Sequence, residues 1–333
     1  MPTIVYPPTI DWHWMPQRPQ HLMTRFARHG CQVYYINLTA RKRPPETLAP
    51  NLSILHQRED LWSVPMPRPV VLWTSWAKVV QDLDYYGPDY VVYDCLDRFA
   101  EWLPYEEDMV RRADLVVASA GNLTERMSRL HRRVIEIQNG CEYEHFAAAR
   151  EQGPLPPELG GLPGPLVMYV GAWAPWVDES LVGAVGRQLP SGSVVVIGPA
   201  FGADFCLKLP NVHYLGIRSY SELPCYLRGA TAALIPFRRT EVTEHTNPIK
   251  LYEYLAAGLP VISTDLPEVR RYGHVTCVCR DALEFLLAVT EAVSSAADPE
   301  QVTHRQDVAR QCSWDARFTA LLTAMAELGG LQL

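Results

Sequence analysis

Short apolar runs alternate with amphipathic segments along the first half of the chain. The apolar runs are rich in Val, Ile, Leu and Tyr, and most carry apolar residues at consecutive positions. Runs of this kind, separated by helices, are typical of a parallel sheet that is covered on both faces. We expect helices at residues 18–28 and 123–130. Strands are expected at residues 3–6, 32–36, 52–55, 69–73, 90–93, 115–118 and 133–137.

The same alternation begins again after residue 165. The pattern predicts an α/β fold with two Rossmann-like, doubly wound domains that face each other across a cleft. Ligands of open parallel sheets bind at the carboxyl ends of the strands, so we expect the site in that cleft. In this half, strands are expected at 166–170, 193–197, 212–215, 232–235, 260–263 and 276–278, and helices at 178–188, 221–228, 249–257 and 314–328.

Between the two halves lies a segment that neither a helix nor a central strand accommodates. Residues 151–165 (EQGPLPPELGGLPGP) hold five prolines and four glycines in fifteen positions, which is typical of a linker. We therefore expect an N-terminal domain at 1–150, a linker at 151–165 and a C-terminal domain at 166–310. A last helical segment at 311–333 is expected to pack back on either domain.

The composition is that of an ordinary globular protein, with 48% hydrophobic and 20% charged residues. The net charge of −7 and the pI near 5.8 give the chain no general attraction for nucleic acid. We therefore expect no nucleic-acid partner. The eight cysteines show no zinc-ligand spacing, and we expect no metal site.

The chain opens directly with an apolar run that is typical of a strand, and no apolar run approaches the roughly 18 residues that a bilayer requires. We therefore expect a cytoplasmic protein with reduced thiols. Arg126, Arg129, Arg132 and Arg133 concentrate positive charge on one helical segment. They form either a solvated helix face or a peripheral contact with the inner face of the cell membrane.

The segment 245–264 (HTNPIKLYEYLAAGLPVIST) carries the clearest chemistry. Asn247 is a favoured N-cap, and Pro248 suits the first turn of a helix that Gly258 ends. The amide groups at the start of such a helix form an anion site. Glu253 lies further along the same helix, where it reaches a sugar hydroxyl of a nucleotide that lies along the helix.

These residues closely resemble the donor-site helix of GT-B glycosyltransferases, in particular the family 4 group of bacterial polysaccharide enzymes. In the first half, QNG at 138–140 followed by Phe146 resembles the family's closing strand. Residues 17–27 (QRPQHLMTRFA) resemble the first helix of a subgroup that makes cell-surface polysaccharides such as teichuronic acid. Further segments resemble the family in order and spacing: 167–171 (VMYVG), 211–216 (NVHYLG), 222–227 (ELPCYL) and 230–237 (ATAALIPF).

The resemblance implies a metal-independent glycosyltransferase that moves a sugar from a nucleotide-diphosphate sugar to a hydroxyl of a sugar or lipid-linked acceptor. Polysaccharide or glycoconjugate biosynthesis is the implied setting, and no cofactor besides the donor substrate is implied. Carried over to this sequence, the resemblance implies that Glu253 binds the ribose hydroxyls of the donor. Backbone groups of Asn247, Pro248 and Ile249 face the diphosphate, and Gly171 lets the donor approach closely.

Two positions depart from the family pattern. His245 stands where the first of two glutamates is usual, and residues 172–175 (AWAP) replace the Arg and Lys that often follow the first glycine turn. A helix start contributes about 0.3–1 kcal/mol per charge, whereas micromolar binding requires about 8 kcal/mol. Cationic side chains must supplement it, and Arg238, Arg239 and Lys250 are the nearest in sequence. We favour Arg238, which directly follows an expected strand.

The catalytic group and the acceptor site are expected in the first domain. Asp94 follows an expected strand and serves either as general base for the acceptor hydroxyl or as the cap of the next helix. Asp97 is the second candidate, and His13, in the loop after the first strand, is the third. In the same loop, Trp12 and Trp14 either stack on an acceptor sugar or anchor the loop in the core.

Two other functions remain open at this point. A nucleotide-sugar epimerase shares the GT-B fold, and a non-catalytic nucleotide-sugar-binding partner subunit agrees with the missing glutamate. A Rossmann oxidoreductase is disfavoured, because no G-x-G-x-x-G follows the first strand. Asp82 and Asp84 match the metal-binding DxD of another transferase fold, but the YYGP after them indicates a surface turn. Family 4 likeness implies retention of anomeric configuration, whereas inversion uses an aspartate base.

Overall fold

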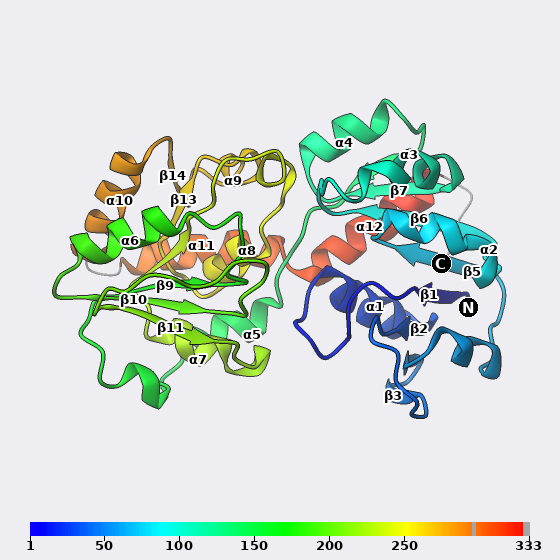
Figure 1. Cartoon of the computed structure of the whole chain (residues 1–333), viewed down its shortest axis with the longest axis horizontal. Coiled ribbons are helices and arrows are strands. Elements are labelled where there is room, and N and C mark those ends of the chain that lie inside the picture. The colour runs from blue at the N-terminus through cyan, green and yellow to red at the C-terminus, as the bar shows by residue number, and fades with distance from the viewer. Residues whose placement is uncertain (295–297, 329–333) are drawn as a thin grey trace. The chain divides into compact units, whose positions relative to one another are not determined.

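The computed structural model describes residues 1–294 and 298–328, and the chain divides into two compact units (Figure 1). The first unit comprises Met1–Asn139, the short segment His245–Asn247 and the C-terminal helix that begins at Trp314. The second unit comprises Gly140–Glu244 and Pro248–Ser313. The chain therefore passes from one unit to the other four times.

The first unit is built on an eight-stranded sheet with the order β3-β4-β2-β1-β5-β6-β7-β8. Neighbouring strands are parallel except for β3 and β4, which pair antiparallel at one edge. The strands are β1 Thr3–Tyr6, β2 Gln32–Ile36, β3 Glu46–Ala49, β4 Leu52–Leu55, β5 Val70–Thr74, β6 Tyr90–Cys95, β7 Leu115–Ala118 and β8 Val134–Glu136. The seven expected strands are confirmed. The additional strand, β3, has no buried residue and hence no apolar face that the sequence pattern would reveal.

Helices of the first unit connect these strands. They are α1 Arg18–Arg28, α2 Leu83–Tyr86, α3 Leu103–Arg112, α4 Gly121–Ser128 and α12 Trp314–Leu328, with the 3-10 turns η1 Arg58–Ser63 and η2 Ala77–Asp82. The amphipathic helix α1 has Pro19 in its first turn, and its apolar residues pack against the sheet. It also carries a buried arginine, Arg18, which matters for the site.

The C-terminal helix α12 packs on α1 within the first unit (Figure 1). Trp314 stacks on His21 with ring centroids 5.0 Å apart, and Phe318 meets Phe26 edge-on, also at 5.0 Å. Of the two positions left open by the sequence, the helix therefore occupies the one on the N-terminal domain. These aromatic pairs bury the apolar stripe of α12.

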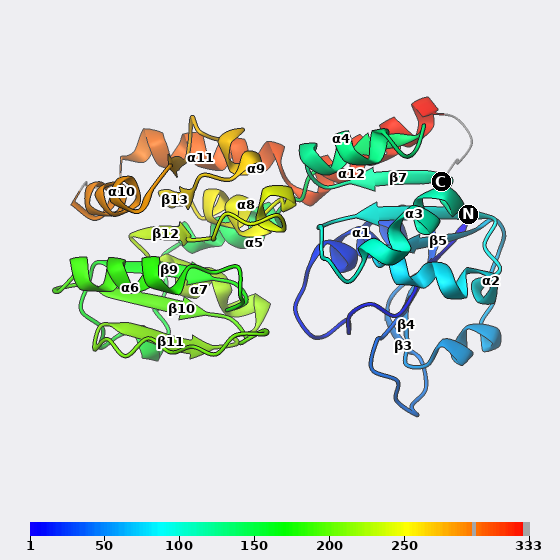
Figure 2. The same cartoon turned by 45° about the horizontal axis from the view of Figure 1, so that its top comes forward.

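The second unit has a six-stranded sheet, all parallel, with the order β11-β10-β9-β12-β13-β14 (Figure 2). The strands are β9 Leu166–Val170, β10 Ser193–Ile197, β11 Val212–Gly216, β12 Ala232–Ile235, β13 Val261–Thr264 and β14 Cys277–Cys279. The helices are α5 Tyr143–Ala147, α6 Glu179–Gln188, α7 Leu223–Arg228, α8 Ile249–Ala256, α9 Pro267–Arg270, α10 Ala282–Ser294 and α11 Pro299–Gln311. Short 3-10 turns are η3 Ala148–Arg150, η4 Pro157–Leu159, η5 Tyr220–Glu222 and η6 Thr243–His245.

The boundary between the units lies at Asn139 and Gly140 rather than in the linker expected at 151–165. That Pro- and Gly-rich segment belongs to the second unit, where Leu159 is buried in the core. Glu158 next to it accepts hydrogen bonds from Arg218 and Tyr226, each at 3.1 Å. Proline and glycine prevent regular structure but do not prevent packing, and this explains why the composition was misleading.

No helix within residues 1–294 and 298–328 has the length and apolar character needed to cross a membrane.

Candidate functional site

Helix α8 of the second unit is fixed against the end of strand β9. The hydroxyl of Tyr254, a fully buried residue of α8, accepts a hydrogen bond from the backbone N–H of Val170 at 2.7 Å and lies 3.2 Å from the carbonyl oxygen of the same residue. Val170 is the last residue of β9, and Gly171 follows it. The helix therefore holds a defined position beside the carboxyl end of the sheet, where ligands of parallel sheets bind.

Two glycines let the turns after β9 and β10 approach each other closely. A side chain at Gly198, which follows β10, would overlap the carbonyl oxygen of Gly171. A Cβ atom at Gly171 would lie 2.5 Å from Cε of Lys250, so the stem of this lysine of α8 passes directly over Gly171. The bare backbone at Gly171 thus makes room for a cation at the end of β9.

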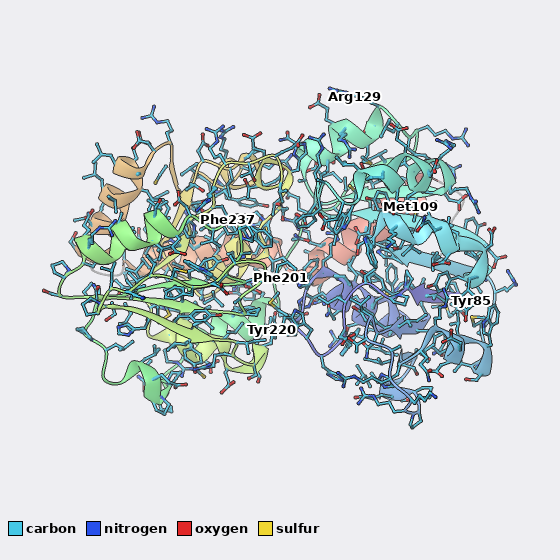
Figure 3. All side chains as sticks on the ribbon, viewed as in Figure 1. Tyr85, Met109, Arg129, Phe201, Tyr220 and Phe237 are labelled. Carbon is cyan, nitrogen blue, oxygen red and sulfur yellow. The ribbon has the colours of Figure 1, made fainter. Side chains whose placement is uncertain are left out.

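Two aromatic rings lie near the ammonium group of Lys250. Its Nζ lies 5.2 Å from the ring centroid of Phe237, labelled in Figure 3, and 5.7 Å from that of Tyr169. Both distances are in the range of a cation–π interaction. The Tyr169 hydroxyl donates a hydrogen bond to the carbonyl of Ala172 at 2.8 Å and so stabilises the turn after β9. The second unit therefore presents a positioned cation beside Gly171.

Glu253 is a buried carboxyl group on the same helix. It is 9% exposed, and its side chain forms no hydrogen bond with any of the described residues. Burial raises the pKa of Glu253 from 4.5 to about 7, although the nearby charge of Lys250 lowers it. A buried carboxyl group without a hydrogen-bond donor is costly. Its polar atoms are therefore suited to hydroxyl groups of a ligand.

The start of α8 differs from the expectation. The helix begins at Ile249, its N-cap is Pro248, and no side chain caps it. Pro248 has an extended backbone (φ −73°, ψ 113°), so the chain enters the helix only after it. The side chain of Asn247 instead accepts a hydrogen bond from the backbone N–H of Asn139. The prediction that Asn247 caps the donor helix is therefore wrong.

Arg238 and Arg239 follow strand β12 but differ in their surroundings. Arg239 lies 3.5 Å from Glu244 and 3.7 Å from Asp265, in two ion pairs. The exposed guanidinium of Arg238 has no ion-pair or hydrogen-bond partner within residues 1–294 and 298–328. Its backbone N–H donates to the carbonyl of Trp176, which holds it beside the turn after β9. Arg238 is thus the arginine of this pair that remains available to an anion.

The contacts of His245 do not group it with the donor helix α8. The segment His245–Asn247 groups with the first unit, whereas Pro248 and α8 group with the second. His245 itself is half-buried. The likeness that placed it among donor-binding residues remains a prediction.

Asp94 was expected to follow a strand, but it lies inside strand β6. It is fully buried, and Arg18 Nε donates to its two carboxylate oxygens at 3.0 and 2.9 Å. The indole N–H of Trp73 donates to it at 3.2 Å. The next helix begins only at Leu103, so Asp94 is neither an accessible base nor a helix cap. The helix-cap interpretation of Asp94 is therefore wrong, and Arg18, far away in sequence, occupies the oxygens that a general base would use.

Asp97 is the carboxylate that follows β6 outside the strand. It is half-buried, and its Oδ1 accepts a hydrogen bond from the hydroxyl of Thr246 at 2.8 Å. Both residues belong to the first unit. Of the two aspartates proposed for catalysis, Asp97 is therefore the one at the carboxyl edge of the sheet.

The loop after β1 contains the other acceptor-side candidates. The Trp12 ring meets Tyr35 edge-on at 4.9 Å, and the backbone N–H of Trp12 donates to Asn37 Oδ1 at 2.8 Å, so Trp12 anchors the loop. Trp14 is 45% exposed and remains available for stacking. Exposed His13 has Nε2 3.3 Å from both carboxylate oxygens of Glu46.

The two aspartates of the DxD pattern lie in exposed ion pairs. Asp82 is 3.7 Å from Arg58, and Asp84 is 3.0 Å from Arg112. They occupy η2 and α2 at the surface of the first unit. Within the described part of the chain, no three His, Cys, Asp or Glu side chains are grouped to hold a metal ion.

Sequence reasoning missed the residues that build the site from a distance. Tyr254 was visible only as an apolar position of α8, and Arg18 only as a charged position of α1. A basic residue at a position that the helical period turns inward was the one available signal for Arg18. Asn139 lies in the QNG motif, but its partners are 108 and 121 residues away.

Comparison with known proteins adds family information to this geometry. The model of the family described as Glycosyl transferases group 1 matches residues 164–295. TuaH of Bacillus subtilis (strain 168), provisionally named a teichuronic acid biosynthesis glycosyltransferase, is 26% identical over 266 residues, which cover 71% of this chain and 67% of TuaH.

Solved structures of other proteins share the fold. Sucrose-phosphate synthase from Thermosynechococcus elongatus has a TM-score of 0.76 at 14% identity and covers 98% of this chain and 99% of its own. Anabaena Alr3699/HepE in complex with UDP and glucose has a TM-score of 0.70 at 13% identity, with 98% and 100% covered. The E. coli trehalose-6-phosphate protein bound with UDP-2-fluoro glucose gives 0.68 at 13% identity, with 97% and 98% covered. At these identities the likeness shows the GT-B fold.

Proposed function

We propose that this chain is a glycosyltransferase of the GT-B fold that uses a nucleotide-sugar donor, and that Glu253 and the start of α8 bind that donor. The observation that carries this proposal is the buried carboxyl group of Glu253, which has no hydrogen-bond donor among the described residues. Ribose hydroxyls of the nucleotide supply the missing donors. Such hydrogen bonds to a charged group contribute about 1.5–3 kcal/mol.

The diphosphate is bound by cations and backbone amides of the second unit. Lys250 lies over Gly171, and Arg238 extends from the end of β12. The amides of the first turn of α8, at Ile249 and Lys250, add the positive end of the helix dipole. Together these groups take the place of the Arg and Lys that the sequence lacks after Gly171. The proposed set needs no metal ion to neutralise the diphosphate.

Uridine diphosphate is the first nucleotide to test. HepE and the E. coli trehalose-6-phosphate protein are described as complexes with UDP or a UDP-sugar, and both share this fold. The exposed aromatic ring of Phe201 (Figure 3), 6.1 Å from that of Trp176, lies after β10 and offers a flat apolar surface at the same edge of the sheet.

The acceptor is a hydroxyl of a sugar or lipid-linked glycan in cell-surface polysaccharide synthesis. The name of TuaH supports this class of product. Asp97 is proposed to receive the proton of the acceptor hydroxyl, because it is the carboxylate beyond the end of β6. Trp14, at 45% exposure, provides a stacking surface for the acceptor sugar.

A lipid-linked acceptor would bring the protein to the inner face of the cell membrane. Arg132 is exposed after α4 and has no ion-pair partner among the described residues, whereas Arg126 and Arg129 pair with Glu106 and Glu125. Arg132 and the neighbouring Arg133 are the cations that would contact lipid phosphates. Cytoplasmic location with peripheral membrane contact is part of the same proposal.

Turnover of a nucleotide-sugar panel tests the proposal. The protein is incubated with UDP-, GDP- and ADP-sugars with and without glycan acceptors, and products are separated by mass spectrometry. Transfer to an acceptor supports the function. An isomerised donor indicates an epimerase, and binding without turnover indicates a partner subunit; either result overturns the proposal.

A further inference from the structure

A network of hydrogen bonds between buried polar groups extends through the first unit from strand β6 to residue 247. It begins at Asp94, whose carboxylate is paired with Arg18. The Nη1 of Arg18 donates to the carbonyl of Ile137 at 2.8 Å and to Asn139 Oδ1 at 3.3 Å. Arg18 and Asp94 are each no more than 1% exposed. A buried ion pair is seldom the most stabilising way to fill a core, so its value lies in fixing one arrangement of its neighbours.

Asn139 has every polar group engaged. Its side chain donates from Nδ2 to the carbonyl of Asn247 at 2.6 Å and accepts from Arg18. Its backbone N–H donates to Asn247 Oδ1 at 3.1 Å, and its carbonyl accepts from Arg317 Nε, also at 3.1 Å. Asn139 therefore donates two hydrogen bonds to Asn247, one from its backbone N–H and one from its side chain, and both residues are buried. Such a pair tolerates little displacement of either backbone.

The segment that contains Asn247 is held at a second point. The hydroxyl of Thr246 donates to Asp97, the proposed catalytic carboxylate, at 2.8 Å. The three residues His245–Asn247 thus group with the first unit, although the chain before and after them belongs to the second. Pro248, the N-cap of α8, is one peptide bond from Asn247. The segment His245–Asn247 is therefore held by Asn139 and by Asp97, both residues of the first unit.

We propose that Arg18 and Asn139 are positioning residues of the transferase, which fix the segment His245–Asn247 and thereby Thr246 and its hydrogen-bond partner Asp97, the proposed catalytic carboxylate. This inference rests on the proposed function. The nucleotide contacts of Glu253 and Lys250, and the anchor of Tyr254 on Val170, lie in the second unit and do not depend on Asn139. Loss of the Asn139 side chain should therefore reduce the rate of transfer far more than nucleotide affinity.

The test compares two asparagines that both bond to backbone carbonyls. Asn139→Ala removes the side-chain bonds to the Asn247 carbonyl and to Arg18 and keeps only the backbone N–H bond to Asn247. Asn211→Ala removes three amide bonds, to the carbonyls of Gly186, Leu189 and Gly192 in the second unit. We expect Asn139→Ala to lower kcat at least tenfold at saturating donor while the Kd for UDP changes less than threefold. Asn211→Ala should lower Tm and leave kcat unchanged at a temperature well below Tm.

Conservative variants add a readout that a general loss of stability does not reproduce. Asn247→Asp keeps the oxygen that accepts from the Asn139 backbone, and it should retain at least five times the kcat of Asn247→Ala. Arg18→Lys keeps the charge beside Asp94 but loses the fork to Ile137 and Asn139, so it should lower kcat in the same direction. The inference is overturned if kcat falls only in proportion to Tm, or if Kd rises as much as kcat falls.

Hydrogen exchange tests the inference without turnover. Peptides spanning residues 245–250 should exchange faster in Asn139→Ala than in the wild type, and at the wild-type rate in Asn211→Ala. Unchanged exchange in Asn139→Ala would overturn the positioning role even if the protein transfers no sugar. Faster exchange in a protein that binds UDP but transfers nothing would support the positioning role while rejecting the proposed function.

Discussion

Asp94 and Glu253 are both buried carboxyl groups near the carboxyl end of a parallel sheet, one in each unit, yet their surroundings differ. The oxygens of Asp94 accept hydrogen bonds from Arg18 and Trp73. Glu253 has no such donor among the described residues, and burial raises its pKa to about 7. A buried carboxylate that is already paired stabilises the arrangement of the fold, whereas one without a hydrogen-bond donor is available to bind a ligand.

The largest expected effect is on the stability of the first unit. Asp94→Ala leaves the buried guanidinium of Arg18 without its anion, which should lower the free energy of unfolding by about 3–5 kcal/mol. Urea denaturation followed by circular dichroism measures this loss. UDP affinity of the folded variant should stay at the wild-type value. An Asp94→Ala protein as stable as the wild type would contradict the structural role.

The second effect is the contribution of Glu253 to the pH dependence of stability. Its pKa is about 7 in the folded protein and 4.5 in the reference state, so the folded protein keeps a proton that the unfolded chain has released. Stability from this group is present below pH 4.5 and is lost as the pH rises through 7. Between pH 4.5 and 8 the wild type should lose on the order of 3 kcal/mol relative to Glu253→Gln. Parallel stability curves for the two proteins would contradict the assignment.

The third effect is on the nucleotide. Glu253→Gln should weaken UDP binding by about 1.5–3 kcal/mol, because the charged acceptor of the ribose hydroxyls is lost. Calorimetry measures the Kd, with Glu291→Gln, an exposed glutamate of α10, as the matched control. Hydroxyl donors favour the ionised carboxyl group, so wild-type affinity should also rise from pH 6 to 8. Equal affinities of the two variants would remove Glu253 from the site.

The smallest effect separates the two neighbouring arginines after β12. Arg238→Ala should weaken UDP binding by about 1 kcal/mol, near fivefold, since its guanidinium is available to the diphosphate. Arg239 is engaged with Glu244 and Asp265, so Arg239→Ala should change the Kd little. The same titration measures both. A larger loss in Arg239→Ala would show that the ion pairs open when the ligand binds.

The two regions also differ in how much of them the sequence predicted. The donor side was accessible because Asn247 to Thr264 form one continuous helix–turn–strand segment, whose local pattern matches its structure apart from the cap. The acceptor side was not, because the partners of Arg18 lie 76 and 119 residues away. Local patterns report periodicity and capping, but they do not report which distant residues meet. Asp94 was therefore placed after the strand, whereas β6 extends to Cys95 and Asp94 pairs with Arg18.

The domain pattern shows the same limit. The strands of both sheets were predicted except for β3, since the others are apolar runs. The boundary was misplaced because Leu159, in a segment rich in proline and glycine, packs into the core of the second unit. The segment His245–Asn247, which returns to the first unit, had no signal in composition or periodicity.

The central claim is that Glu253 binds the ribose hydroxyls of the donor nucleotide, and a four-way titration tests it most directly. UDP and 2′,3′-dideoxyuridine diphosphate are titrated into the wild type and into Glu253→Gln by calorimetry. We predict that removing the hydroxyls weakens binding to the wild type by about 1.5–3 kcal/mol and leaves binding to Glu253→Gln nearly unchanged. An equal loss in both proteins would show that Glu253 does not contact the ribose.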